Sequence, residues 1–250
     1  MKIITQSQTT STDLKEIQTS APVSVIIPYL SREIHLLKAL ETWYAQQYKG
    51  HLGIVVVDFS DKPSPIDLHR VRLIRSQNTR WNICRARNLG ARNAYGNLLI
   101  FSQADMLVNP TFVSQITKTW DDNDMWVTEC ISRNLPCDPA LNGILAVKRW
   151  VNTLLRGFNE QLMESPHGWG YDAIDYRLRA QMLLQQHGCS FGEFKAEDVT
   201  IISHSDRERT EPYDCKNMEE TYQAHKRYSQ WYRERYGFVA NIGQDWGQPR

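Results

Sequence analysis

The chain has 250 residues, of which 41% are hydrophobic, 23% are charged and 10% are aromatic. This length and composition are typical of a globular protein of one domain, and they exclude a disordered or fibrous chain. The formal net charge of +1 gives no electrostatic reason to expect nucleic acid as the partner.

The first hundred residues after a polar leader alternate between two patterns. Short β-branched runs such as VSVIIP and LGIVVVD are typical of buried strands. Apolar residues at helical spacing separate them. Strands are predicted at 23–28, 52–58, 71–74 and 97–101, and helices at 32–47 and 82–95. This alternation predicts an α/β fold, with a mostly parallel, Rossmann-like sheet and helices on both faces.

Beyond residue 122 the pattern is looser, and it predicts a smaller region with a mixed sheet. Strands are expected near 125–130, 144–148 and 199–203, a loop at 157–170, and helices at 172–186 and 216–236. Residues 237–250 read as a tail that contains glycine.

Cysteine usage and hydropathy indicate the compartment. Five cysteines are an odd number without a CxxC spacing, which argues against a zinc site or a disulfide framework. Residues 1–20 lack the apolar core of a secretory signal, and no run of about eighteen apolar residues could span a bilayer. We therefore expect a cytoplasmic protein.

Two acidic residues stand where a parallel sheet binds its ligands, at the carboxyl ends of strands. Asp58 ends one predicted strand, and Asp105 is the first acid after another, in the segment FSQADMLV. Carboxylate and phosphate oxygens are the ligands that Mg²⁺ and Mn²⁺ prefer. Asp105 is thus a candidate metal ligand, although the same residue could simply cap the following turn.

Five segments, in chain order, resemble the family-2 glycosyltransferases and their relatives, the β-galactosyltransferases and polypeptide N-acetylgalactosaminyltransferases, which share the GT-A fold. They are VSVIIPYLSR, IVVVDFSD, RARNLGARNAYGNLLIFSQAD, NGILAVKRWVNTLLRGFNEQL and GWGYDAIDYRLR, and together they cover roughly residues 22–205. The resemblance implies a metal-dependent enzyme. It would move a hexose or N-acetylhexosamine from a nucleotide sugar, with UDP-sugars favoured, to a glycan, lipid-linked or peptide acceptor.

The same resemblance implies a division of the chain within one GT-A domain. Residues 1–20 would be a flexible leader and residues 21–120 the half that binds the nucleotide sugar. Residues 121–210 would form the half that holds the acceptor and the donor sugar. Residues 211–250 would be a C-terminal helix and tail.

Roles for the nucleotide-binding half follow residue by residue. Asp58 would bind the nucleobase or ribose, in a pocket bordered by Pro28, Tyr29 and Arg32. Arg87, with Asn88 beside it, would face the donor, because the planar guanidinium fork donates two hydrogen bonds to a diphosphate.

The metal would be Mn²⁺ or Mg²⁺, held by Asp105. His204, in the segment IISHSD, stands where relatives place a late histidine that completes the metal shell. The alternative is that His204 is an ordinary surface histidine.

The segment GWGYDAID supplies the candidate catalytic acids. Trp169 and Gly170 would form a loop that packs against the sugar. Asp172 and Asp175 open the next helix on one shared face, and Arg179, one turn further on, is a possible partner for Asp175. Asp172 would contact hydroxyls of the donor sugar. The alternative is that both acids only stabilise the start of the helix.

Two positions depart from the family pattern. Gln103 replaces the first acid of the usual Asp-x-Asp motif, so it could still bind a ribose but adds no charge for a metal. Ala173 stands where inverting relatives have their catalytic base, and alanine cannot accept a proton. Three alternatives stay open: Asp172 or Asp175 is the base, the enzyme is retaining, or the chain is a catalytically silent module that binds a sugar nucleotide or glycan. A Rossmann-type cofactor enzyme is disfavoured, because no G-x-G-x-x-G follows the first strand.

Overall fold

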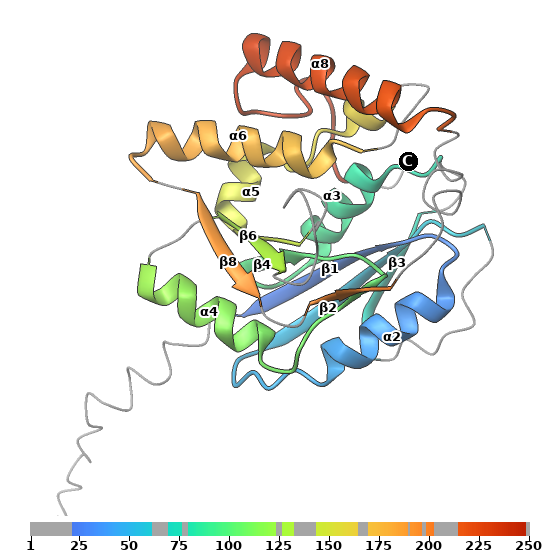
Figure 1. The fold of residues 1–250 in the computed structure, drawn as a ribbon, viewed down its shortest axis with the longest axis vertical. Helices are drawn as coiled ribbons and strands as arrows, with labels where there is room; N and C mark the ends of the chain where they lie inside the picture. The colour runs from blue at the N-terminus through green and yellow to red at the C-terminus, as the bar shows by residue number, and fades with distance from the viewer. Residues whose placement is uncertain are drawn as a thin grey trace, which may run out of the picture.

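A seven-stranded sheet forms the centre of the computed structural model, which describes residues 22–61, 70–76, 80–123, 127–132, 144–164, 170–189, 191–196, 199–202 and 215–248 (Figure 1). The strand order is β3-β2-β1-β4-β7-β6-β8, and a separate pair is formed by β5 and β9. The strands are β1 (Val23–Tyr29), β2 (Leu52–Asp58), β3 (Arg72–Arg75), β4 (Leu98–Phe101), β5 (Met106–Leu107), β6 (Val127–Ser132), β7 (Leu145–Lys148), β8 (Gly192–Ala196) and β9 (Thr200–Ile201).

Most of the sheet is parallel. β1 pairs in parallel with both β2 and β4, and β2 with β3. β7 runs antiparallel to its neighbours β4 and β6, while β8 is parallel to β6. The pair of β5 and β9 is antiparallel. The predicted α/β fold with a mostly parallel sheet and a smaller second sheet is therefore confirmed.

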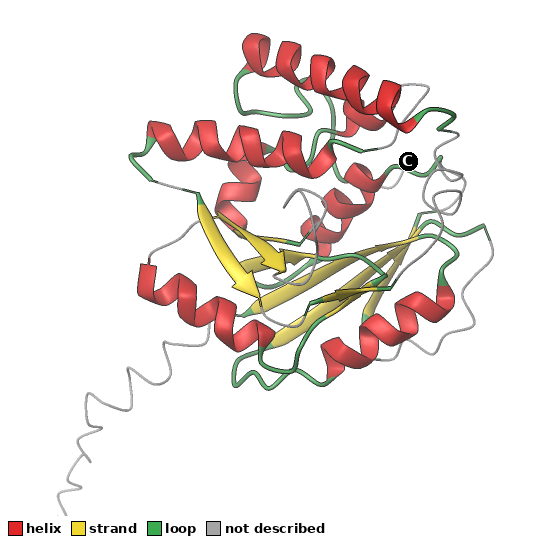
Figure 2. Ribbon diagram, viewed as in Figure 1, coloured by secondary structure: helices red, strands yellow, loops and turns green. Residues whose placement is uncertain are grey.

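Helices cover both faces of the sheet, as Figure 2 shows. They are α2 (Glu33–Tyr44), α3 (Ile83–Asn93), α4 (Phe112–Asn123), α5 (Arg149–Leu155), the 3₁₀ helix η2 (Glu160–Met163), α6 (Asp172–Gln186) and α8 (Met218–Tyr236). Alternate side chains of β1 enter two separate cores. Val25 and Ile27 pack with α2 and α4, whereas Ile26 packs with α3, α5 and α6. Helix α8 lies outside α6 (Figure 1).

Five elements were not predicted, namely α4, α5, η2, β5 and β8. Helix α5 has only seven residues, and β5 has two, so neither is long enough to show a period. Strand β8 is the edge of the sheet, and its sequence GEFKA begins with glycine and carries two charges. Such features are common at sheet edges but weaken the strand signal.

Helix α3 lies unusually close to the sheet because residue 90 is glycine. A Cβ atom there would lie 2.4 Å from Cγ2 of Ile26 and 3.1 Å from Cγ2 of Val57. No side chain could occupy that space without moving the helix or the strands. Since Arg87 lies one turn before Gly90, this contact also sets the height of Arg87 above the sheet.

Candidate active site

The first part of the site lies at the carboxyl ends of β1 and β2. Tyr29 and Asp58 are partners in the last pair of the ladder, and Pro28 is buried beside them. Asp58 is only 2% exposed, and its Oδ1 accepts a hydrogen bond of 2.8 Å from the amide of Ser60. The structure thus groups three of the predicted pocket residues.

The second part is the turn after β4. Asp105 is 4% exposed, and its Oδ2 lies 3.7 Å from Nη1 of Arg32. Gln103, half-buried, accepts from the amide of Met106 at 3.4 Å and so closes the turn. The chain returns here through β9, where the amide of Ile202 donates to the carbonyl of Asp105 at 2.8 Å. His204 lies outside the described residues.

A divalent cation suits this turn chemically. Mg²⁺ is usually held by one or two carboxylates together with substrate phosphates, rather than by a cage made only of protein. Asp105 supplies such a carboxylate. Among the residues that the structure describes, no group of three His, Cys, Asp or Glu side chains forms a closed metal site. The described residues therefore fit a cation shared with phosphate oxygens of a ligand.

The third part is an ion pair between α3 and α6. Nη1 of Arg87 donates to Oδ2 of Asp172, the first residue of α6. Arg87 is 1% exposed, and its guanidinium stacks 4.7 Å from the ring centroid of Phe158. Phe158 in turn meets Phe101, the last residue of β4, with 4.9 Å between ring centroids. These contacts connect the ion pair to the strand that leads into Asp105.

Asp175 lies in the interior instead of facing a ligand. It is 0% exposed, and both carboxylate oxygens are bonded. Oδ2 accepts from Nε of Arg179 at 2.8 Å, as the sequence predicted, and Oδ1 accepts from Oγ of Ser229 at 2.5 Å. In this arrangement Asp175 connects α6 to α8 and offers no atom to a substrate, contrary to the expectation of a catalytic role.

Asn88 is also turned away from its predicted position facing the donor. It is 0% exposed, and its side-chain amide forms two hydrogen bonds of 2.8 Å with the backbone of Phe158. Its Nδ2 further donates to Oε1 of Glu160 at 2.9 Å. Asn88 therefore fixes the turn that carries Phe158, the ring on which Arg87 stacks.

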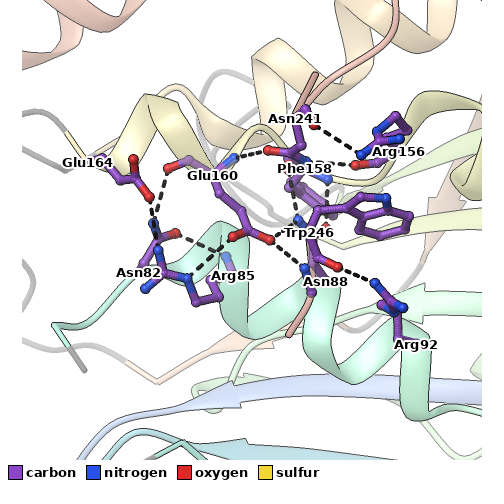
Figure 3. A network of polar contacts seen from close by, with 11 residues as sticks. Asn82, Arg85, Asn88, Arg92, Arg156, Phe158, Glu160, Glu164, Asn241 and Trp246 are labelled. Atoms are coloured by element: carbon purple, nitrogen blue, oxygen red, sulfur yellow. Dashed lines mark hydrogen bonds and ion pairs between the residues drawn. The ribbon is translucent and has the colours of Figure 1, made fainter. Parts of the chain in front are cut away.

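Glu160 is the centre of a buried network that the sequence did not reveal (Figure 3). Besides Asn88, its carboxylate accepts from Nε of Arg85 at 3.3 Å and from the amide of Gly247 at 2.8 Å. The amide of Glu160 donates to Oδ1 of Asn241 at 2.9 Å. Residues from α3, η2 and the C-terminal tail thus meet on one carboxylate.

Burial raises the pKa values of three side chains, those of Cys84, Tyr176 and Tyr228. It raises the pKa of the Cys84 thiol well above its ordinary value. Asp172 acts in the same direction, and Arg87 partly opposes it. Burial also raises the pKa of Tyr228 to about 12 and that of Tyr176 further. These groups stay protonated near neutral pH, so Cys84 is not an available nucleophile.

Of the GWG segment, only Gly170 is described, and Trp169 lies outside the described residues. Gly170 and Tyr171 both have left-handed backbone conformations, with φ of 79° and 69°. They direct the chain into α6, which places Asp172 against Arg87. Among the residues that the structure describes, no helix is both long and apolar enough to cross a membrane.

Solved structures share this fold at low sequence identity. A mannosyltransferase from Pyrobaculum calidifontis, in complex with GDP-Man and Mn²⁺, is 19% identical with a TM-score of 0.56, over 76% of this chain and 59% of that one. Glucosyl-3-phosphoglycerate synthase from Mycobacterium tuberculosis, with Mg²⁺ and UDP, is 14% identical with a TM-score of 0.59, over 95% and 87%. TarS 1–349 of S. aureus is 18% identical with a TM-score of 0.51, over 64% and 55%.

The chain therefore spans less than two thirds of the mannosyltransferase and of the TarS structure. No protein with a curated description matches it in sequence. Residues 24–173, more than half of the chain, match the family described as Glycosyl transferase family 2, and this range includes Asp58, Arg87, Asp105 and Asp172. The chain belongs to glycosyl transferase family 2.

Proposed function

We propose that the protein transfers a hexose or N-acetylhexosamine from a UDP-sugar to a glycan, lipid-linked or peptide acceptor, with the help of Mn²⁺ or Mg²⁺. The observation that carries this proposal is the buried pair of Arg87 and Asp172. Nε of Arg87 is buried and has no hydrogen-bond partner among the described residues. Because Arg87 is 1% exposed and paired with Asp172, a diphosphate would reach its guanidinium when that pair opens, and the planar fork could then donate to the phosphates.

The nucleotide would lie along the carboxyl ends of β1 and β2. In this proposal Asp58 binds the base or ribose, and Tyr29 and Arg32 border the pocket. This position agrees with the rule that open parallel sheets bind ligands at the carboxyl ends of their strands. The division into a nucleotide half at 21–120 and a sugar half at 121–210 is part of the same proposal.

Asp105 would hold the cation together with phosphate oxygens of the donor, and His204 would join it. When bound, the cation neutralises charge on the leaving diphosphate. The position of Ile202 supports this pairing, because its amide is bonded to the backbone of Asp105. Two of the three solved structures named above contain a divalent cation, Mn²⁺ in the mannosyltransferase and Mg²⁺ in the synthase.

Asp172 is our candidate for the acid that meets the sugar. Asp175 is buried and fully bonded, and Ala173 has no group that accepts a proton, so Asp172 is the acid of this segment that remains partly exposed. If the enzyme inverts, Asp172 would be the base that deprotonates the acceptor. If it retains, as the likeness of WGYDAID to the polypeptide N-acetylgalactosaminyltransferases suggests, Asp172 would orient the sugar.

The test is to incubate the protein with Mn²⁺ and a panel of nucleotide sugars, with GDP-mannose included, and to measure released nucleoside diphosphate. We expect release with one UDP-sugar, enhanced by its acceptor, and none from the Asp172→Asn variant. Folded protein that releases nucleotide from no donor, with acceptors of all three classes present, would contradict the proposal.

The second candidate is a silent binding module, which Gln103 and Ala173 favour because each replaces an acid of the usual motifs. Calorimetry separates the two. Binding of UDP-sugar without turnover supports the module, and turnover that depends on Asp105 excludes it.

A further inference from the structure

The turn that leads into Asp172 is held in a conformation that the chain does not favour by itself. Gly170 and the next residue, Tyr171, have φ values of 79° and 69°. Glycine adopts this left-handed region readily, but a tyrosine does so at a cost. Tyr171 is the N-cap of α6, and its side chain forms no capping hydrogen bond. Such a conformation persists only where neighbouring groups hold it.

Helix α8 supplies two of those groups. Nδ1 of His225 lies 3.0 Å from the carbonyl oxygen of Gly170. Because a carbonyl oxygen only accepts, Nδ1 must carry the proton and donate. The ring of Tyr222 meets the ring of Tyr171 edge-on, with centroids 5.2 Å apart. His225 is 2% exposed, so its bond is shielded from water.

The same face of α8 holds the first turn of α6. Ser229, one turn after His225, donates to Oδ1 of Asp175, and Nη1 of Arg233 lies 3.9 Å from that oxygen. The amide of Asp175 donates to the carbonyl of Tyr171 at 2.8 Å. Asp175 is therefore fixed to the strained turn through its backbone and to α8 through its side chain.

We propose that His225 and Ser229 are positioning residues, which hold the turn at Gly170 and Tyr171 so that Asp172 meets Arg87. The relevance for catalysis rests on the proposed function of Asp172. The family match ends at residue 173, so α8 lies outside it and the positioning helix is a feature of this chain's own C-terminal part.

The experiment compares His225→Leu, which removes the donor at similar volume, with His225→Asn, whose Nδ2 can donate from about the same place. Hydrogen exchange of the amides at 171–176 is measured in the full chain, together with kcat and the donor KM. In His225→Leu we expect exchange at least about tenfold faster in this segment. We expect kcat to fall about ten- to a hundredfold with donor KM within about twofold, because Asp172 is misplaced while the nucleotide pocket is intact. In His225→Asn, both the slow exchange at 171–176 and the kcat should return most of the way to wild-type values.

The matched control is Gln230→Ala on the exposed side of the same helix, where, among the residues that the structure describes, the side chain of Gln230 bonds only to Glu234, at 2.9 Å. It should leave exchange and kcat unchanged. If His225→Leu does not fold, the same exchange and kinetic measurements are made on Ser229→Ala, with the same expected result. That variant removes one hydrogen bond to Asp175 and keeps the one from Arg179.

Unchanged exchange at 171–176 in both variants overturns the proposal. An active wild-type enzyme with that result leaves the proposed function standing. If the wild-type protein releases no nucleotide, the proposed function fails, and the exchange data alone decide whether α8 holds the turn.

Discussion

Arg87 and Asp172 are 85 residues apart in the chain and form an ion pair in which the guanidinium is 1% exposed. Both residues lie within the family match, Arg87 on α3 near its middle and Asp172 at the start of α6 near its end. A buried charge needs a partner, so each of the two side chains holds the other in place. The pair therefore couples the helix that we propose to bind the donor to the proposed sugar-binding acid.

Removing Arg87 should damage both stability and turnover. Arg87→Ala leaves Asp172 without its partner and exposes the face of Phe158, so we expect a loss of about 3 kcal/mol in the free energy of unfolding. kcat/KM should fall at least about a hundredfold. Arg87→Lys keeps the charge but loses the planar fork, so its stability and its kcat/KM should lie between those of Arg87→Ala and those of the wild type. Urea unfolding and steady-state kinetics measure these effects.

Arg92→Ala is the control for Arg87, because Arg92 lies on the same helix and is partly exposed, and its side chain bonds, within the described part of the chain, only to the C-terminal tail. It should keep turnover within about twofold of wild type. Equal losses in both variants would mean that the helix as a whole, and not the ion pair, matters.

Asp105→Asn should weaken metal activation specifically. The amide retains the shape of the side chain but loses the charge that a divalent cation requires. We expect the Mn²⁺ concentration for half-maximal turnover to rise by at least about tenfold, or activity to disappear. Asp245→Asn, at a largely exposed carboxylate, is the matched control and should leave the Mn²⁺ titration unchanged. An Asp105→Asn enzyme with a wild-type titration would place the cation elsewhere.

Glu160→Gln tests the buried network. The amide has the size of the carboxylate, but its NH₂ group must face Arg85, Asn88 or the amide of Gly247, all of which are donors. We expect a loss of about 2–4 kcal/mol in the free energy of unfolding, measured by urea or thermal denaturation. Glu219→Gln, on the exposed face of α8, should change it by less than about 0.5 kcal/mol. A Glu160→Gln protein as stable as wild type would show that the carboxylate is not charged in the network.

Stability should fall at alkaline pH. The pKa of the Cys84 thiol is raised above its ordinary value of 9.0, and that of Tyr228 is raised from 10.0 to about 12. Above pH 9 the unfolded chain therefore releases protons that the folded chain keeps, so the free energy of unfolding decreases as pH rises. The urea midpoint should be constant from pH 7 to 8 and decline from pH 9 upward. Tyr228→Phe should decline less steeply, and a wild-type midpoint that stays constant to pH 10.5 would contradict this account.

The elements that the sequence predicted well are those whose pattern is local. Strand β2 and helix α6 have the predicted bounds, because LGIVVVD is a continuous apolar run and the helix begins with two acids. The sequence also placed Asp58 and Asp105 correctly at the carboxyl ends of their strands. This placement depends only on where each strand ends and in which direction it runs, and both follow from the local sequence pattern.

The parts that were missed depend on residues distant in the chain. The family resemblance assigned Asp175 and Asn88 to the site. Contacts with residues distant in the chain, including Ser229 for Asp175 and both Phe158 and Glu160 for Asn88, make them buried structural residues instead. Asn241 gives no local signal either, although it closes the network from the tail. A motif predicts that a polar residue matters, but whether it faces a ligand or the interior depends on the packing.

The close approach of the sheet to Gly90 has a consequence for how this enzyme could be altered. Any side chain at that position, even a methyl group, would push α3 away from Ile26, and the displacement would be passed on to Arg87 one turn earlier. If Arg87 faces the donor as we propose, a substitution at residue 90 would therefore lower the affinity for the nucleotide sugar. The tolerance of residue 90 to mutation is thus limited by the position that Arg87 must keep, as well as by the core.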